Sequence, residues 1–197
     1  MTGRFPVVDA TASRLADLVL ARPPVHDGRV VAVDGPSGAG KTTLAAALRR
    51  SLRDAGQDVR LLHLDNVYDG WDGLAAGIAT AAREVVAPYL AGTEGRYRRY
   101  DWHRGRFAEE HVVAPGGVLV VEGVGAGAAC AGTPALVVWL DAPPDVRLER
   151  GVARDGEKLR GRLLAWHAQE AEVLAAAGTR ERADVRLDGT FAQPSGD

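Results

Sequence analysis

One segment of the sequence has residue types and spacing that are suited to hold phosphate groups. It is Gly35-Pro36-Ser37-Gly38-Ala39-Gly40-Lys41-Thr42, which satisfies the pattern G-x-x-x-x-G-K-[ST] in full and is followed by Thr43. Glycines let the backbone curl so that consecutive N–H groups face phosphate oxygens, and the following helix adds its positive N-terminal end. Lys41 is one of only two lysines among 24 basic residues, so composition does not explain its position. The segment predicts a site for a nucleoside triphosphate.

Two side chains of this phosphate loop have distinct predicted roles. Lys41, on a loop expected to face solvent, would reach the β- and γ-phosphates, and the hydroxyl of Thr42 would bind magnesium. Residues 35–43 are therefore the predicted nucleotide contacts, with ATP and Mg²⁺ as the predicted cofactors. The sequence has no N-K-x-D motif, which specifies guanine, and this favours ATP over GTP.

Two acidic residues stand at the ends of apolar runs, where ligands bind in open α/β sheets. Asp65 follows the run that begins at Val59, and Glu122 ends the run that begins at Val118. An aspartate at such an edge can accept the proton of an acceptor hydroxyl and align its oxygen with the γ-phosphate. An acid on the neighbouring strand can hold magnesium beside Thr42. Asp65 is thus the predicted catalytic base, and Glu122 with Thr42 the predicted metal site; helix or loop capping is the alternative for both acids.

Arginines form two groups in the sequence. Arg147, Arg150 and Arg154 are spaced i, i+3 and i+7, which places them on one face of a helix. Beside a phosphate site that face can clamp a transferring phosphoryl group, and Arg154 is the predicted catalytic contact. Solvated helix charges are the alternative. The second group, Arg96 to Arg106, suits a small anionic ligand better than a nucleic-acid duplex.

The elements that must position these residues alternate between short apolar runs and longer helical patterns, which predicts an α/β fold with a five-stranded parallel sheet. Strands are predicted at Arg29–Asp34, Val59–Leu64, Val118–Glu122, Leu136–Asp141 and Asp184–Leu187. Helices are predicted at Ala10–Ala21, Lys41–Ala55, Leu74–Ala87, Asp145–Arg154 and Glu157–Ala176. The polar, aromatic and basic segment 92–114 is predicted to be an insertion that faces substrate. The tail from Gly189 is expected to fray.

Length and composition predict a single domain over residues 1–197, because 46% hydrophobic residues suffice for a full core. The net charge of -2 gives no general nucleic-acid footprint, and no apolar stretch approaches membrane-spanning length. The single cysteine, Cys130, excludes an internal disulfide framework and favours the cytoplasm. The predicted partner is a small-molecule acceptor, without nucleic acid or membrane, and the choice between a monomer and a homo-oligomer stays open.

Together these motifs resemble the P-loop nucleoside kinases of the uridine kinase/phosphoribulokinase family. The resemblance covers roughly residues 29–187 and rests on GPSGAGKTT, LDNVY, YDWHR, VVEGV, RGVARD and ADV, in the order of the family. It implies the P-loop NTPase fold of nucleoside and nucleotide kinases, a three-layer α/β/α sandwich with a five-stranded parallel sheet.

The resemblance also implies roles for individual residues. It makes Asp65 the catalytic base, places Tyr68 by the nucleoside and puts Glu122 near magnesium. A β-hairpin is expected to close over the base and an arginine-bearing lid, predicted at 147–165, over the phosphates, with Arg150 as a nucleotide contact and Arg154 beside it. The predicted acceptor contacts are Asp65, Tyr68, Tyr100, Asp101, Trp102, His103 and Arg104. For His103 a surface position, and for the aromatic residues core packing, are the alternatives.

The sequence therefore predicts an ATP- and magnesium-dependent kinase that phosphorylates a hydroxyl of a small molecule, and the resemblance implies a nucleoside such as uridine or cytidine. Asp69-Gly70-Trp71-Asp72-Gly73 departs from the usual uridine kinase sequence, so the acceptor stays open. One alternative is a kinase for a sugar, pantothenate-like or phosphosugar acceptor, whose anionic group would bind the arginines of 96–106. The other is a regulatory ATP-binding protein with little turnover. Asp65 favours an enzyme.

Overall fold

Five parallel strands form the centre of the structure, a computed structural model that describes residues 6–192. The strand order is β2-β5-β1-β6-β7. The bounds are Gly28–Asp34 for β1, Val59–His63 for β2, Gly117–Glu122 for β5, Leu136–Asp141 for β6 and Val185–Asp188 for β7. All neighbouring pairs in this sheet are parallel. The predicted parallel sheet is confirmed, and each predicted strand lies within one residue of the observed bounds.

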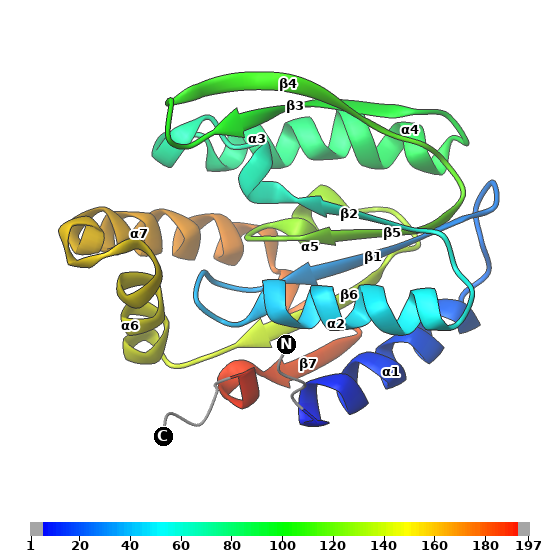
Figure 1. Cartoon of the computed structure of the whole chain (residues 1–197), viewed down its shortest axis with the longest axis horizontal. Coiled ribbons are helices and arrows are strands. Elements are labelled where there is room, and N and C mark those ends of the chain that lie inside the picture. The colour runs from blue at the N-terminus through cyan, green and yellow to red at the C-terminus, as the bar shows by residue number, and fades with distance from the viewer. Residues whose placement is uncertain (1–5, 193–197) are drawn as a thin grey trace.

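Helices cover both faces of the sheet (Figure 1), which confirms the three-layer sandwich. Alternate residues of β1 face opposite layers, as the two-residue period of a strand requires: Val30 and Ala32 belong to one buried cluster, Val31 and Val33 to the other. Helices α1 (Pro6–Ala21) and α2 (Lys41–Asp54) cover the second cluster. Helices α5 (Ala126–Ala129) and α7 (Arg160–Ala177), with the segment that follows β2, cover the first.

The helix predicted at Leu74–Ala87 is not one regular α-helix. It consists of α3 (Leu74–Thr80), a wide π-turn (Ala81–Val86) and α4 (Ala87–Leu90). In the wide turn the N–H of Ala87 donates to the carbonyl of Ala82, five residues earlier. Pro88 has no N–H, and its ring clashes with the carbonyl four residues before it in an α-helix, so a wider turn accommodates the proline.

The segment predicted as an insertion forms a separate antiparallel hairpin. Strand β3 (Gly95–Asp101) pairs with β4 (Arg106–Val113), and the register shifts between Arg98 and Tyr100. Figure 1 shows the hairpin lying over α3 and α4, on the side of those helices away from the main sheet. A two-stranded hairpin is marginally stable alone, so its position depends on this packing.

The C-terminal part runs through α6 (Pro144–Asp155), a 3-10 turn (Glu157–Leu159), α7 and α8 (Thr179–Arg182) to β7. The predicted fraying from Gly189 is wrong for residues 189–192, which form a 3-10 turn. Gly189 packs so closely that a Cβ on it would lie 1.9 Å from the carbonyl oxygen of Ala39. The remainder of the predicted tail, 193–197, lies outside the described residues. Within residues 6–192, no helix combines the length and apolar character needed to cross a membrane.

Candidate active site

The phosphate loop connects β1 to α2 at the carboxyl edge of the sheet (Figure 1). Gly40, which caps α2, has a φ of 99°, a conformation that glycine adopts without a Cβ penalty. Gly38 lies against α6, where a Cβ on it would be 2.5 Å from the carbonyl oxygen of Arg147. The first turn of α2 leaves N–H groups free of helical partners, and these attract an anion. The backbone of residues 35–43 therefore suits phosphate groups.

Lys41 does not face solvent as expected. Its side chain is buried, with 7% exposure, and Nζ donates to the carbonyl oxygen of Pro36 at 2.9 Å. The side chain is thus folded back along the loop and has a neutral acceptor as its partner. A phosphate oxygen is a stronger acceptor for an ammonium group than a carbonyl, so a bound phosphate would compete for this contact.

Glu122, at the end of β5, connects the phosphate loop with β2. Its carboxylate is buried, and the hydroxyl of Thr42 donates to it at 3.3 Å from Oε1 and 3.4 Å from Oε2. On the other side, Nδ1 of His63 lies 2.5 Å from Oε1. His63 and Glu122 are register partners in the parallel pair β2 and β5, so their side chains meet at the strand ends.

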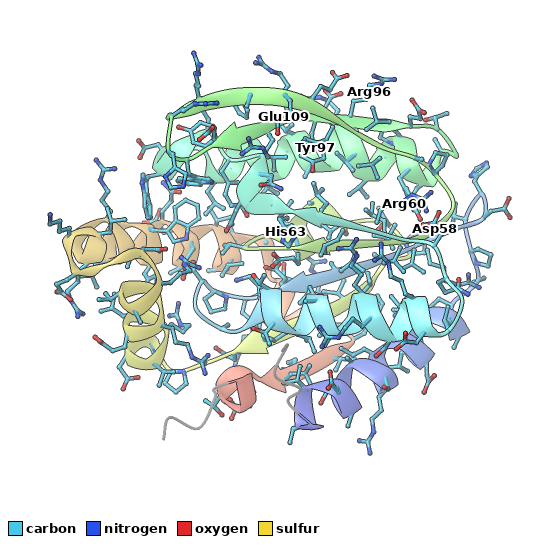
Figure 2. All side chains as sticks on the ribbon, in the orientation of Figure 1. Asp58, Arg60, His63, Arg96, Tyr97 and Glu109 are labelled. Carbon is cyan, nitrogen blue, oxygen red and sulfur yellow. The ribbon has the colours of Figure 1, made fainter. Side chains whose placement is uncertain are left out.

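His63 is a residue of this site that sequence reasoning missed. The hydrogen bond to Glu122 raises the pKa of His63 above its ordinary value, with burial acting in the opposite direction. Figure 2 shows His63 at the opposite end of β2 from Asp58 and Arg60. The sequence contained a signal for it, because His63 ends an apolar strand two residues before Asp65, but only the strand pairing identifies Glu122 as its partner.

Asp65 lies on the 3-10 turn Leu64–Asn66 directly after β2. Asp65 has solvent-exposed surface. Its pKa is nevertheless raised, first because the surrounding protein removes water from around the carboxylate and then because of the negative charge of Glu122. Lys41, Arg154 and His63 lower this pKa by their positive charges. The predicted base, metal ligand and two predicted cationic contacts therefore gather at one edge of the sheet. An aspartate with a raised pKa is suited to accept a proton.

The hairpin is joined to this turn through Trp102. The indole Nε1 of Trp102 donates to the backbone carbonyl of Asp65 at 2.8 Å, and its ring meets Tyr100 edge to face at a centroid distance of 5.3 Å. With 39% exposure, Trp102 also borders solvent. The hairpin end therefore lies directly beside Asp65, where an acceptor would have to approach.

Five aromatic residues, which we call the aromatic wall, continue from the hairpin to α7. They are Tyr68, Trp71, Tyr100, Trp102 and Trp166. Trp71, on the 3-10 turn Gly70–Asp72, meets Trp102 and Trp166 edge to face, with centroids 5.6 and 5.9 Å apart. Trp166, which packs on Tyr68 in turn, was not selected from the sequence. Edge-to-face contacts of this kind hold large rings in fixed positions.

Tyr68 forms the buried end of the aromatic wall. It has no exposed surface, and its hydroxyl donates to the carbonyl of Val124 at 2.7 Å. Burial raises the pKa of Tyr68 well above its ordinary value. The structure thus gives this ring a packing role in the core, and its contact with an acceptor stays a prediction.

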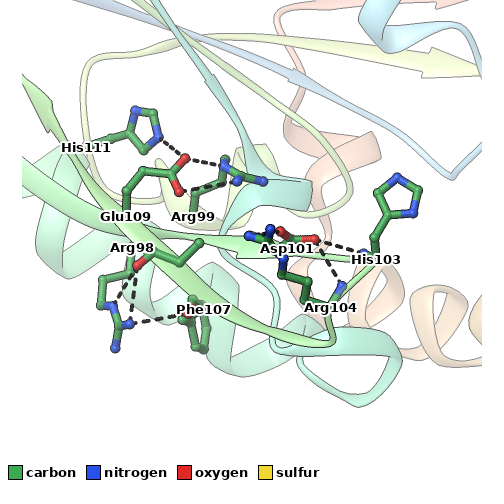
Figure 3. Close-up of polar contacts among 9 residues, drawn as sticks. Arg98, Arg99, Asp101, His103, Arg104, Phe107, Glu109 and His111 are labelled. Atoms are coloured by element: carbon green, nitrogen blue, oxygen red, sulfur yellow. Dashed lines mark hydrogen bonds and ion pairs between the residues drawn. The ribbon is translucent and has the colours of Figure 1, made fainter.

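Asp101 stabilises the turn of the hairpin. Its Oδ1 accepts the backbone N–H groups of His103 and Arg104, each at 3.0 Å (Figure 3), and the bond from Arg104 contributes most to lowering the pKa of Asp101. The side chains of His103 and Arg104 are exposed. The three predicted acceptor contacts therefore lie together, with the carboxylate of Asp101 already engaged by the turn.

The arginines of 96–106 mostly have partners within the hairpin. Arg96 pairs with Glu94 and Glu110 at 2.9 Å each, and Arg99 pairs with Glu109. Arg98 donates to the carbonyls of Phe107 and Ala108, as Figure 3 shows. Acids of the same hairpin therefore compensate much of the positive charge that suggested an anionic ligand.

The three arginines of α6 have different surroundings, although their spacing places them on one helix face. Arg147 pairs with Glu170 at 2.8 Å, and Arg150 donates to the carbonyls of Gly38 at 2.9 Å and Gly189 at 3.1 Å. Arg154 pairs with Asp155 at 2.7 Å and is largely exposed. Two of them thus contact the phosphate loop itself, while the charge of Arg154 acts on Asp65. Their contacts with phosphate stay predictions.

Asp34 is a further residue that sequence reasoning missed. It is fully buried at the end of β1, and its carboxylate accepts the N–H groups of Gly35 at 2.7 Å, Gly125 at 2.7 Å and Gly127 at 2.9 Å. Burial raises the pKa of Asp34, and the three hydrogen bonds oppose that shift. Asp34 thereby fixes the start of the phosphate loop to the segment after β5. An acid that ends an apolar strand just before Gly35 was the available signal.

The comparisons with known proteins agree with this architecture. A family model described as AAA domain matches residues 31–175. The fold is similar to that of a possible uridine kinase from Bacillus stearothermophilus, with a TM-score of 0.68 at 20% identity over 92% of this chain and 100% of that one. It is also similar to a candidate fructose transport system kinase from Silicibacter sp. TM1040, with a TM-score of 0.64 at 20% identity over 91% and 98% of the two chains. No curated protein sequence matches. The structural likenesses confirm the predicted P-loop kinase fold.

Proposed function

The chain belongs to the AAA domain family, and on this premise we propose that it is an ATP- and magnesium-dependent kinase. It transfers the γ-phosphoryl group to a hydroxyl of a small molecule, and a nucleoside such as uridine or cytidine is the first acceptor class to test. The observation that carries the proposal is that Glu122 contacts Thr42 of the phosphate loop on one side and His63, two residues before Asp65, on the other. A passive nucleotide-binding protein needs the phosphate loop but has no use for Asp65.

Residues 35–43 would hold the triphosphate through backbone N–H groups and the ammonium of Lys41. Magnesium, when bound, neutralises negative charge on the phosphates. Thr42 and Glu122 would hold it, because hard oxygen ligands suit this ion and few protein ligands are needed at phosphate sites. The hydrogen bond between Thr42 and Glu122 supports this assignment, since it places both oxygen groups at one point. Among residues 6–192 there is no group of three or more His, Cys, Asp or Glu side chains arranged for a metal.

On the acceptor side, Asp65 would orient the incoming hydroxyl and take its proton. The positive charge of Arg154 acts at the same place and would offset charge that develops on the phosphoryl group. Trp102 and Trp71 would border the acceptor and exclude water from Asp65, which is supported by the indole contact of Trp102 with the Asp65 carbonyl. A phosphosugar acceptor is less favoured, because two of the arginines that would bind its anionic group, Arg96 and Arg99, are paired with glutamates of the hairpin region.

An acceptor panel tests this proposal. Purified protein with ATP and Mg²⁺ is offered nucleosides, sugars, pantothenate-like alcohols and phosphosugars, and ADP release is compared with the background without acceptor. We expect a nucleoside to raise ADP release well above that background, with a phosphorylated product of matching mass. If only another class of acceptor raises ADP release, the proposed acceptor is wrong and the proposed kinase activity stands. ADP release that no acceptor raises would favour the regulatory ATP-binding protein instead.

Glu122→Gln is expected to raise the Mg²⁺ concentration for half-maximal activity by about tenfold, because the amide keeps the shape of the side chain but loses the charge that attracts the ion. The measurement is a Mg²⁺ titration of ADP formation at fixed ATP. Glu172→Gln, at an exposed position of α7, is the matched control and should titrate like the unmodified protein. An unchanged Mg²⁺ requirement in Glu122→Gln would remove Glu122 from the metal site.

A further inference from the structure

A buried carboxylate from α7 contacts the phosphate loop. Glu170 is 1% exposed, and its Oε2 accepts both the backbone N–H of Ser37 at 2.9 Å and the Ser37 hydroxyl at 2.8 Å. Ser37 lies inside the loop, between Gly35 and Lys41. Oε2 of Glu170 thus holds both the main chain and the side chain of Ser37.

The other oxygen of Glu170 is held by Arg147. Nη1 of Arg147 lies 2.8 Å from Oε1 of Glu170 and 3.4 Å from the carbonyl oxygen of Ser37, so the guanidinium contacts both partners. A buried ion pair gains little net stability over apolar side chains of similar size, but removing one partner leaves a costly buried charge. The arrangement is therefore poorly explained by general packing, and its specific effect is to hold Ser37.

The helix that carries Glu170 is packed against the rest of the molecule through the aromatic wall. Trp166 lies one helical turn before it on the same face of α7, and its ring packs 5.6 Å from Tyr68 and 5.9 Å from Trp71. Arg150 adds a second external contact to the loop through the carbonyl of Gly38. The loop segment Ser37–Gly38 is thus held from outside by α6 and α7, in addition to its own turn.

We propose that Glu170 is a positioning residue that holds the phosphate loop, through Ser37, in the conformation that receives a triphosphate. The inference rests on the proposed function, because it assigns a role in nucleotide binding. Without the carboxylate, the N–H groups next to Ser37 lose their fixed directions, and nucleotide binding has to order the loop. The dissociation constant for ADP with Mg²⁺ should then rise about tenfold, while an acceptor bound at Asp65 is unaffected.

The test uses the full chain in five forms: unmodified, Glu170→Gln, Ser37→Ala, the double variant of these two, and Glu172→Gln. Calorimetry gives the dissociation constant for ADP with Mg²⁺, and hydrogen exchange follows the amides of residues 35–40 without nucleotide. We expect weaker ADP binding and faster exchange in Glu170→Gln, a smaller change of both in Ser37→Ala, and neither change in the exposed control Glu172→Gln. Because Ser37 and Glu170 share one contact, the double variant should be no worse than Glu170→Gln alone.

The outcomes separate this inference from the proposed function. If the unmodified protein binds no ADP, the proposed function fails, while the exchange measurement still decides whether Glu170 orders the loop. If both variants bind ADP and exchange like the unmodified protein, Glu170 is only a packing residue and the inference is wrong. Should Glu170→Gln fail to fold because Arg147 loses its partner, Ser37→Ala decides, since it leaves that ion pair intact.

Discussion

Lys41→Ala is expected to lower phosphoryl transfer by about three orders of magnitude, to near the uncatalysed background. The ammonium group supplies positive charge where negative charge is concentrated on the β- and γ-phosphates, and the loop contains no other lysine. The fold should remain, because the hydrogen bond from the charged Nζ to the Pro36 carbonyl is worth about 2 kcal/mol, less than the free energy of unfolding of a typical domain. Steady-state ADP formation measures the loss of transfer, and thermal unfolding without ligand measures whether the fold is kept.

Arg14→Ala is the control, since Arg14 is a cationic side chain exposed on α1, outside both the phosphate loop and the predicted lid. It should keep normal transfer. Normal turnover in Lys41→Ala would remove the phosphate loop from the mechanism. A large loss of thermal stability would show instead that the buried position of Lys41 is structural.

Asp65→Asn is expected to lower the rate of transfer by about two to four orders of magnitude, because asparagine keeps the size of the side chain but cannot accept the proton of the acceptor hydroxyl. Nucleotide affinity should barely change, since Asp65 follows β2 and lies on a different segment from the phosphate loop. Single-turnover transfer to the best acceptor and calorimetry with ATP test both statements. Asp69→Asn, four residues later and exposed, is the control.

The pH dependence gives a second readout for Asp65. Its pKa is raised, mainly by the protein around it and then by Glu122, so the carboxyl takes up its proton at a higher pH than an ordinary aspartate. Transfer that needs the ionised form should fall as the pH drops through that pKa, and Asp65→Asn should lack this decline. Loss of ATP binding in Asp65→Asn would instead place Asp65 in the metal site, and Asp72 and Asp101 would become the candidates for the base.

The sequence by itself determined the features that depend on neighbours along the chain. The phosphate loop is specified by consecutive residues, because backbone curvature and the start of α2 both follow from Gly35–Thr42. Strand positions were equally predictable, since runs such as Val118–Val121 are buried on both faces and need to be apolar throughout. Asp65 and Glu122 could be assigned to one edge because parallel strands all end on the same side of a sheet.

Only the tertiary structure decided which side chains meet at that edge. His63 contacts Glu122 because β2 pairs with β5, and strand order is set by the packing of the whole sheet and its helices rather than by any local pattern. Glu170 contacts Ser37 across 133 positions of sequence because α7 packs there through Trp166. The folded structure also buries Lys41, on a loop that local sequence places in solvent. Contacts of this kind depend on surfaces assembled from distant segments, and residue type and spacing alone did not identify these partners.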